Sequence, residues 1–128
     1  MRFHVDTDYL IYALSRQGPE RQRLLELAES SVEIAISAVA WFEFARGPRT
    51  PGQLAVARSF FLEDGIVAFS ESLAEHAADV FRRLRSPRRR AADIAIGVTA
   101  AASGAVLLTR NARDFVGVSG LRIEEVSG

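Results

Sequence analysis

Four carboxylate side chains lie in or beside apolar segments of this sequence. They are Asp6 in HVDTDY, Glu43 in AWFEFARG, Asp93 in RAADIAIG and Asp114 in TRNARDF. An ionised carboxylate is costly in such surroundings unless hydrogen-bond donors or a positive charge satisfy it. Four of them in one cluster would repel one another strongly without a counter-ion. The pattern therefore predicts a site for a divalent cation.

A hard cation such as Mg²⁺ or Mn²⁺ fits this set of residues. These ions take oxygen ligands and keep several bound waters, and the chain has no cysteine with which to build a thiolate site. Such an ion lowers the pKa of a bound water, positions it in line with a phosphodiester and stabilises the departing oxygen. The four acids therefore favour the chemistry of a metal-dependent nuclease.

Two of the acids also have simpler explanations. Asp6 and Asp8 follow a predicted strand and precede a helix, so either could cap that helix. Glu43 could form an ordinary ion pair with Arg46, three residues further along the same helix. The residues alone leave both alternatives open.

Asp93 lies near the start of the segment AADIAIGVTAAASG, whose residues are apolar or small on every side of a helix. A carboxylate on a buried helix face needs a partner, and Gly97 and Ala100 on its own face cannot supply one. Helix capping, or an ion pair with Arg89 or Arg90, is the alternative to metal binding.

Asp114 could likewise cap a turn. Thr109 and Asn111 precede it and are short polar residues of the kind that orient ligands or water. The two histidines, His4 and His76, have no matching partners for general acid–base work, and we expect them to be structural.

All sixteen basic residues are arginine, and the absence of lysine excludes a phosphate-binding P-loop and Schiff-base catalysis. Six of them fall within nine residues just before Asp93: Arg82, Arg83, Arg85, Arg88, Arg89 and Arg90. The last three adjoin the predicted site and could bind the RNA phosphates that flank a cleaved bond. The alternative is a solvated helix end whose arginines pair with Glu75 or Asp79.

A chain of 128 residues is long enough for one domain, which we expect to span residues 1–128. Its 48% apolar and 25% charged residues are typical of a soluble globular protein. The opening MRFHVDTDYLIYAL holds two aspartates in its apolar stretch and has no cleavage signature. We therefore expect neither a signal peptide nor a membrane span, and a cytoplasmic location.

Alternating and apolar runs predict five strands, at residues 2–6, 31–37, 65–69, 105–109 and 121–126. Helix boundaries are predicted at Pro19, at Ser37, at Thr50-Pro51, at a capping box of Ser72 with Glu75, at Ser86-Pro87 and at Gly104. Strands separated by helices imply a parallel sheet covered on both faces, which is a three-layer α/β/α domain. Ligands bind such domains beyond the carboxyl ends of the strands, where Asp6 and Asp114 are expected.

These motifs resemble those of the PIN-domain nucleases and, within them, the VapC toxins of bacterial and archaeal toxin–antitoxin pairs. The segment VDTDYLIYAL resembles the first family motif, AVAWFEFARG the second, and RRRAADIAIGVTAAASGAVLLTRNARDF the linked third and fourth. The resemblance covers the whole chain. It implies metal ligands at Asp6, Glu43, Asp93 and Asp114, with Thr109 and Asn111 in support. Asp8 departs from the family pattern, which often has asparagine or serine there, so we expect it beside the site and not as a ligand.

The resemblance also implies an activity and partners. It implies a Mg²⁺- or Mn²⁺-dependent endoribonuclease that cleaves structured cellular RNA such as tRNA or rRNA and so inhibits translation and growth. Such proteins are usually homodimers. A VapB-like antitoxin holds them inactive in a hetero-oligomer, with its tail over the active site and often with an arginine presented to the carboxylates.

Three other functions are compatible with parts of the sequence. The nearest is a housekeeping PIN-domain nuclease for RNA processing, which would lack an adjacent gene for a small DNA-binding antitoxin. A haloacid-dehalogenase-like phosphatase would use Asp6 and Asp8 as nucleophile and acid, and a phospho-receiver domain shares the acidic magnesium pocket. Both normally need a lysine, and this chain has none.

Overall fold

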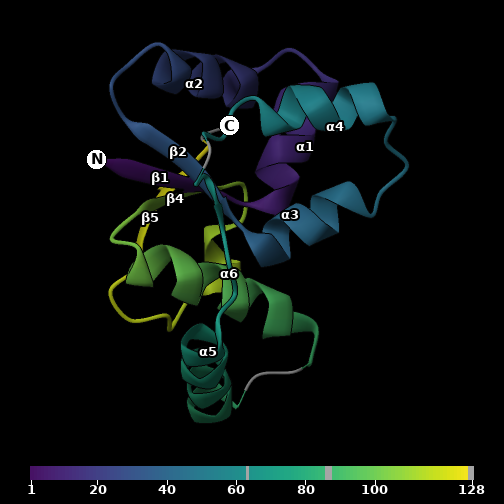
Figure 1. The fold of residues 1–128 in the computed structure, drawn as a ribbon. Coiled ribbons are helices and arrows are strands. Elements are labelled where there is room, and N and C mark those ends of the chain that lie inside the picture. The colour runs from purple at the N-terminus through teal and green to yellow at the C-terminus, as the bar shows by residue number, and fades with distance from the viewer. Residues whose placement is uncertain (63, 86–87, 127–128) are drawn as a thin grey trace.

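A parallel sheet lies at the centre of the computed structural model, which describes residues 1–62, 64–85 and 88–126 (Figure 1). Its strands are β1 (Arg2–Val5), β2 (Glu33–Ser37), β3 (Ile66–Val67), β4 (Val106–Thr109) and β5 (Arg122–Glu125). They are arranged in the order β3-β2-β1-β4-β5, and every pairing is parallel. The predicted sheet of about five parallel strands is therefore confirmed.

Helices connect the strands and cover both faces of the sheet. They are α1 (Thr7–Ser15), α2 (Pro19–Ala28), α3 (Ala38–Ala45), α4 (Pro51–Arg58), α5 (Glu71–Leu84) and α6 (Ala91–Ala102), with 3₁₀ turns η1 (Arg88–Arg90) and η2 (Ala112–Phe115). Figure 1 shows α1, α2 and α4 on one side of the sheet and α5 and α6 on the other. The predicted three-layer α/β/α architecture is confirmed. None of the helices in the described part of the chain is long and apolar enough to cross a bilayer.

Local sequence explains where most of these helices begin. Pro19 and Pro51 lie at the first positions of α2 and α4, where a missing N–H has no cost. Ser37 caps α3, and Thr50 forms a capping box with Gln53 at the start of α4. These predicted starts are confirmed.

The predicted capping box of Ser72 with Glu75 at the start of α5 is wrong. The helix begins at Glu71, and the Ser70 hydroxyl accepts a hydrogen bond from the backbone N–H of Leu73. A Ser-x-x-Glu spacing makes a capping box only if the serine has the extended backbone of a cap. Ser70 has that backbone, with φ −72° and ψ 169°, so Ser72 and Glu75 fall inside the helix.

The ends of α5 and α6 were also predicted from local signals. The end predicted at Ser86-Pro87 lies outside the described residues; α5 ends at Leu84, and Arg85 follows it in the left-handed conformation. The end of α6 near Gly104 is confirmed, because this glycine has φ 65°, a conformation that glycine adopts without strain.

Apolar side chains fill the space between the sheet and its helices. The larger core cluster joins Phe3 of β1 to Leu10 of α1 and Leu24 of α2. A smaller cluster packs Val80 of α5 against Ile94 of α6. The resulting core holds the carboxyl ends of β1 and β4 side by side, which positions the residues that follow them.

His4 is buried within β1, and neither of its ring nitrogens has a hydrogen-bond partner among the described residues. Burial, together with the charge of Arg2, lowers the pKa of His4 to about 4. The imidazole is therefore neutral at physiological pH and acts as a core side chain, as the sequence predicts.

Candidate active site

Side chains from separate segments meet in a cavity of about 240 Å³ at the carboxyl ends of β1 and β4. The residues that line it are Asp6, Thr7, Asp8, Ile11, Glu43, Arg46, Asp93, Asn111 and Asp114. The structure thus brings together all four carboxylates that the sequence indicates, and Asn111 with them. Thr109 lies behind the cavity and reaches it through a hydrogen bond.

Asp6 follows β1 directly and is the N-cap of α1. Its Oδ1 accepts a hydrogen bond from the backbone N–H of Thr7 at 2.8 Å, and its Oδ2 accepts one from the Thr109 hydroxyl at 2.9 Å. Burial raises the pKa of Asp6 to about 6 against the effect of these two hydrogen bonds, and the charges of Asp8 and Glu43 raise it further. Asp6 therefore both caps α1 and lines the cavity.

Glu43 enters the cavity from α3. The Thr7 hydroxyl donates a hydrogen bond to Glu43 Oε1 at 2.8 Å, which fixes one carboxylate oxygen. No ion pair joins Glu43 to Arg46 among the described residues. The ion pair that the sequence left open is therefore not formed.

Asp93 lies in the first turn of α6 and makes no hydrogen bond or ion pair within the described part of the chain. Burial raises the pKa of Asp93 to about 7, and the charges of Asp6, Asp114 and Glu43 add to this effect, while Arg90 opposes it. Asp6, the other acid with a raised pKa, accepts two hydrogen bonds, so Asp93 is the less satisfied of the two.

Asp114 is held by the turn after β4. The Thr109 hydroxyl accepts a hydrogen bond from the backbone N–H of Asn111 at 3.0 Å, and the backbone N–H of Asp114 donates to the Asn111 carbonyl at 3.0 Å. The Arg90 guanidinium donates to the carbonyls of Asp114 and Val116, both at 3.1 Å. Arg90 therefore ties the start of α6 to the turn that carries Asp114.

The sequence profile of the PIN-domain family matches residues 4–121. The chain belongs to the PIN-domain family. No curated protein sequence matches it at a significant level.

Solved structures with this PIN fold include several toxin–antitoxin complexes. A toxin–antitoxin complex from Klebsiella pneumoniae contains a chain with 27% identity and a TM-score of 0.72, covering 96% of this chain and 98% of that one. VapBC2 from Rickettsia felis, bound to a DNA fragment from its promoter, gives 20% identity and a TM-score of 0.77 over 99% and 100% of the two chains. The DNA-bound VapBC complex from Salmonella typhimurium contains a chain with 22% identity and a TM-score of 0.72, and the match covers 98% of each chain. The resemblance to the PIN-domain family is therefore confirmed, and the chain shares its fold with chains of VapBC complexes.

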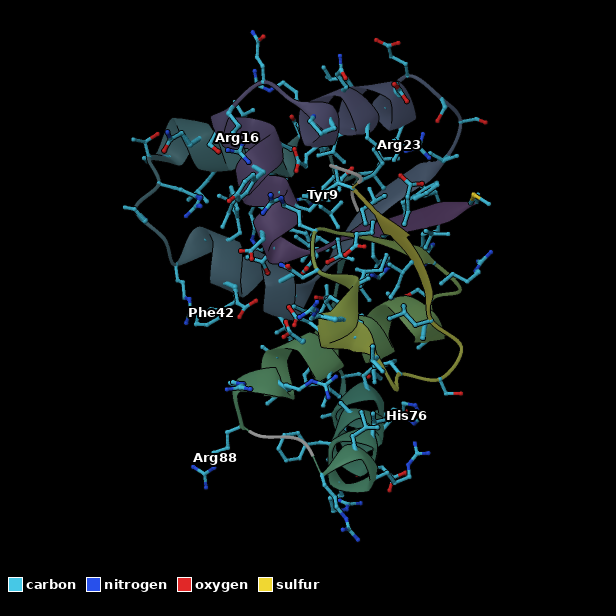
Figure 2. All side chains as sticks on the ribbon, turned by 180° about the vertical axis from the view of Figure 1, so that it is seen from behind. Tyr9, Arg16, Arg23, Phe42, His76 and Arg88 are labelled. Carbon is cyan, nitrogen blue, oxygen red and sulfur yellow. The ribbon has the colours of Figure 1, made fainter. Side chains whose placement is uncertain are left out.

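The arginines of η1 and Arg46 of this PIN domain lie at different places relative to the acidic cavity. Arg88 and Arg89 are exposed on η1, and Figure 2 shows Arg88 projecting away from the body of the molecule. Neither lines the cavity, whereas Arg46 does. RNA binding by the η1 arginines stays a prediction.

Thr7 and Arg46 are site residues that sequence reasoning missed as such. Thr7 could have been found because it directly follows Asp6, at a position where a hydroxyl can reach across the start of a helix. Arg46 carried no such signal, since its spacing from Glu43 is that of an ordinary helical ion pair.

The cavity lining carries the carboxyl groups of five acids and a single guanidinium. Within the described residues, no three aspartate, glutamate or histidine side chains form a ready-made ligand group for a metal ion. Burial, with the charges of neighbouring carboxylates, nevertheless raises the pKa values of Asp6 and Asp93, so a bound cation would favour their ionised forms. Mg²⁺ keeps several waters and needs only one or two direct carboxylates. The donor set therefore fits a hydrated divalent cation.

Proposed function

We propose that this PIN domain is a Mg²⁺- or Mn²⁺-dependent endoribonuclease and the toxin of a VapBC-type toxin–antitoxin pair. Its family and its structural neighbours support the broader class, a nuclease of the VapC type. One observation carries the finer proposal. Four carboxylates converge on one cavity whose own cations are too few to balance them: Asp6, Glu43, Asp93 and Asp114.

These four residues would hold the cation, which when bound activates a water for attack on a phosphodiester and stabilises the departing oxygen. The chain itself prepares the site. Hydroxyl and backbone donors from Thr7 and Thr109 orient Asp6 and Glu43 before any ligand arrives. The Asn111 amide lines the cavity and can orient a water or a phosphate oxygen.

The proposed substrate is structured cellular RNA such as tRNA or rRNA, whose cleavage inhibits translation and growth. Exposed guanidinium groups at Arg88 and Arg89, beside the start of α6, support phosphate binding next to the cavity. This activity would take place in the cytoplasm.

An apolar groove beside the cavity supports a protein partner. The groove has a volume of about 670 Å³, lies between α1, α3 and α4, and shares Ile11 with the acidic cavity. Leu14, Phe44 and Val56 contribute to its lining. Because the structural neighbours are toxin–antitoxin complexes, we propose that the tail of a VapB-like antitoxin covers groove and cavity together. The proposed assemblies are a homodimer and a hetero-oligomer with this antitoxin.

Cleavage of total cellular RNA by the purified protein tests the activity. We expect discrete fragments with Mg²⁺ or Mn²⁺, none with EDTA, and none with Asp93→Asn. The control is Arg2→Gln, which removes a charge at the opposite end of β1 and should leave cleavage unchanged. Intact RNA from folded, metal-bound protein would refute the activity, and equal cleavage by Asp93→Asn would refute the site.

A further inference from the structure

Phe42 is the one aromatic side chain among the described residues that lies exposed at the surface, with 62% of its area accessible to solvent. Its neighbours on α3 behave differently. Trp41 and Phe44 stack with ring centroids 5.7 Å apart, and Trp41 also meets the edge of Phe61. Figure 2 shows Phe42 on the outer side of α3, away from the sheet. Its ring therefore takes no part in the core.

Arg46 lies one turn further along the same face of α3. Its guanidinium carbon is 5.8 Å from the centroid of the Phe42 ring, and the side chain lines the acidic cavity. Among the described residues, the guanidinium forms no hydrogen bond or ion pair, although Glu43 is three positions away. A cation at the mouth of this cavity is therefore available to an anionic ligand.

An RNA strand supplies both groups that this pair would recognise. Guanidinium groups bind phosphate oxygens through paired hydrogen bonds, and unpaired bases stack on aromatic rings. We infer that Arg46 binds an RNA phosphate at the cavity mouth and that Phe42 stacks on the base of an adjoining unpaired nucleotide. The inference rests on the proposed nuclease function and adds a substrate preference. It selects single-stranded or loop RNA, because bases within a duplex are not free to stack on a protein ring.

RNA binding can be measured without cleavage in an Asp93→Asn background, by fluorescence anisotropy of a short single-stranded RNA and of the same sequence as a duplex. We expect Phe42→Leu to weaken single-strand binding about tenfold, as loss of one stacked base does, and to leave duplex binding unchanged. Phe42→Trp should restore binding. Arg46→Gln should weaken it and lower the slope of log affinity against log salt by about 0.7, whereas Arg2→Gln should change neither value.

Steady-state cleavage with the intact active site separates binding from chemistry. We expect Phe42→Leu to raise KM about tenfold while kcat changes less than about threefold. Single-strand binding that is unaffected by Phe42→Leu would overturn the inference while leaving the nuclease function in place. Metal-dependent cleavage that fails while Phe42-dependent RNA binding persists would overturn the proposed function alone.

Sedimentation velocity distinguishes RNA from a protein partner at this surface. The inference predicts the same oligomeric state for the unmodified protein and for Phe42→Leu. A shift to a smaller species in Phe42→Leu would show that a second copy of the chain covers the ring, and it would overturn the inference.

Discussion

Two threonine hydroxyls determine how the carboxylates of this site are held. Thr109 donates to Asp6, and Thr7 donates to Glu43, so both acids have fixed orientations. Asp93 has no comparable donor among the described residues. Burial and the neighbouring negative charges raise the pKa of Asp93 further than that of Asp6, so removing the charge of Asp93 should relieve much of the unfavourable electrostatics at little structural cost. Asp6 is a poorer choice for this test, because its removal also deletes the N-cap of α1.

In metal-free protein, Asp93→Asn should raise the free energy of unfolding at pH 8 by about 1–2 kcal/mol, a figure reduced for solvent screening of this half-exposed carboxyl. The folded-state pKa of Asp93 is about 7, above its ordinary 3.8. At Asp93 the folded protein therefore binds more protons than the unfolded chain between these values, and ionisation of this group lowers stability as the pH rises through this window. Asparagine carries no charge and avoids this loss.

Urea unfolding in EDTA at pH 4, 6 and 8 measures the effect of Asp93→Asn. The difference from the unmodified protein should be small at pH 4 and grow with pH. Glu29→Gln, at an exposed position outside the cluster, is the control and should show no such trend. A difference that does not depend on pH would contradict the expected cost of an ionised, partly buried Asp93.

At the scale of elements, helix starts place two of the acids. Asp6 caps α1, and Asp93 lies in the first turn of α6. The positive ends of these helix dipoles favour negative charge at both positions. Glu43 reaches the same cavity from the last turn of α3, which begins immediately after β2. Strand ends and helix starts therefore place Asp6 and Asp93, and the far end of α3 places Glu43.

The start of α5 gives an element-scale prediction. Ser70→Ala should lower the free energy of unfolding by about 1 kcal/mol, because it removes the acceptor for the Leu73 N–H. Ser72→Ala is the matched control and should change stability by less than about 0.5 kcal/mol, since this exposed serine lies inside the helix. Urea unfolding of the two variants decides between the two caps. A larger loss in Ser72→Ala would support the capping box that the sequence predicts.

At the scale of the whole molecule, an acidic cavity and an apolar groove lie next to each other and share Ile11. A ligand for the cavity must bring positive charge, whereas a ligand for the groove must bring apolar side chains. An antitoxin tail that carries an arginine would satisfy both, and RNA with a cation would satisfy the cavity alone. Under the proposed function, the cavity would serve the catalytic state, and the cavity and groove together would serve the inhibited state.

Excess Mg²⁺ should raise the melting temperature of the metal-free protein, and by more at pH 8 than at pH 6. A ligand that binds only the folded state stabilises it by mass action. Protons compete with the cation below the pKa of Asp93, which is about 7. Thermal unfolding with Mg²⁺ or with EDTA measures the shift, and Asp93→Asn should reduce it. Equal shifts at both pH values would argue against binding by these carboxylates.

Much of this fold could be predicted because its signals are local. The alternation of apolar residues determines the strands, prolines and capping residues mark most helix starts, and helices between strands require parallel pairing. The four acidic positions also follow from the sequence, since Asp6 ends a predicted strand, Glu43 interrupts an apolar helical run, Asp93 lies near a helix start and Asp114 follows the fourth strand. Even the error at Ser72 was local, because two serines two residues apart offered competing caps.

The tertiary structure decided what no local pattern contains. Whether Arg46 pairs with Glu43 or lines the cavity depends on the packing of α3 against its neighbours, and the hydroxyl of Thr7 reaches Glu43 only because α1 and α3 lie side by side. Arg90 binds the turn of Asp114 because α6 and η2 are in contact. The sequence by itself determined which acids are present and which elements carry them. Hydrogen bonds between distant segments determined which acids are satisfied, because a donor's reach depends on the packed positions of two elements and not on their separation along the chain.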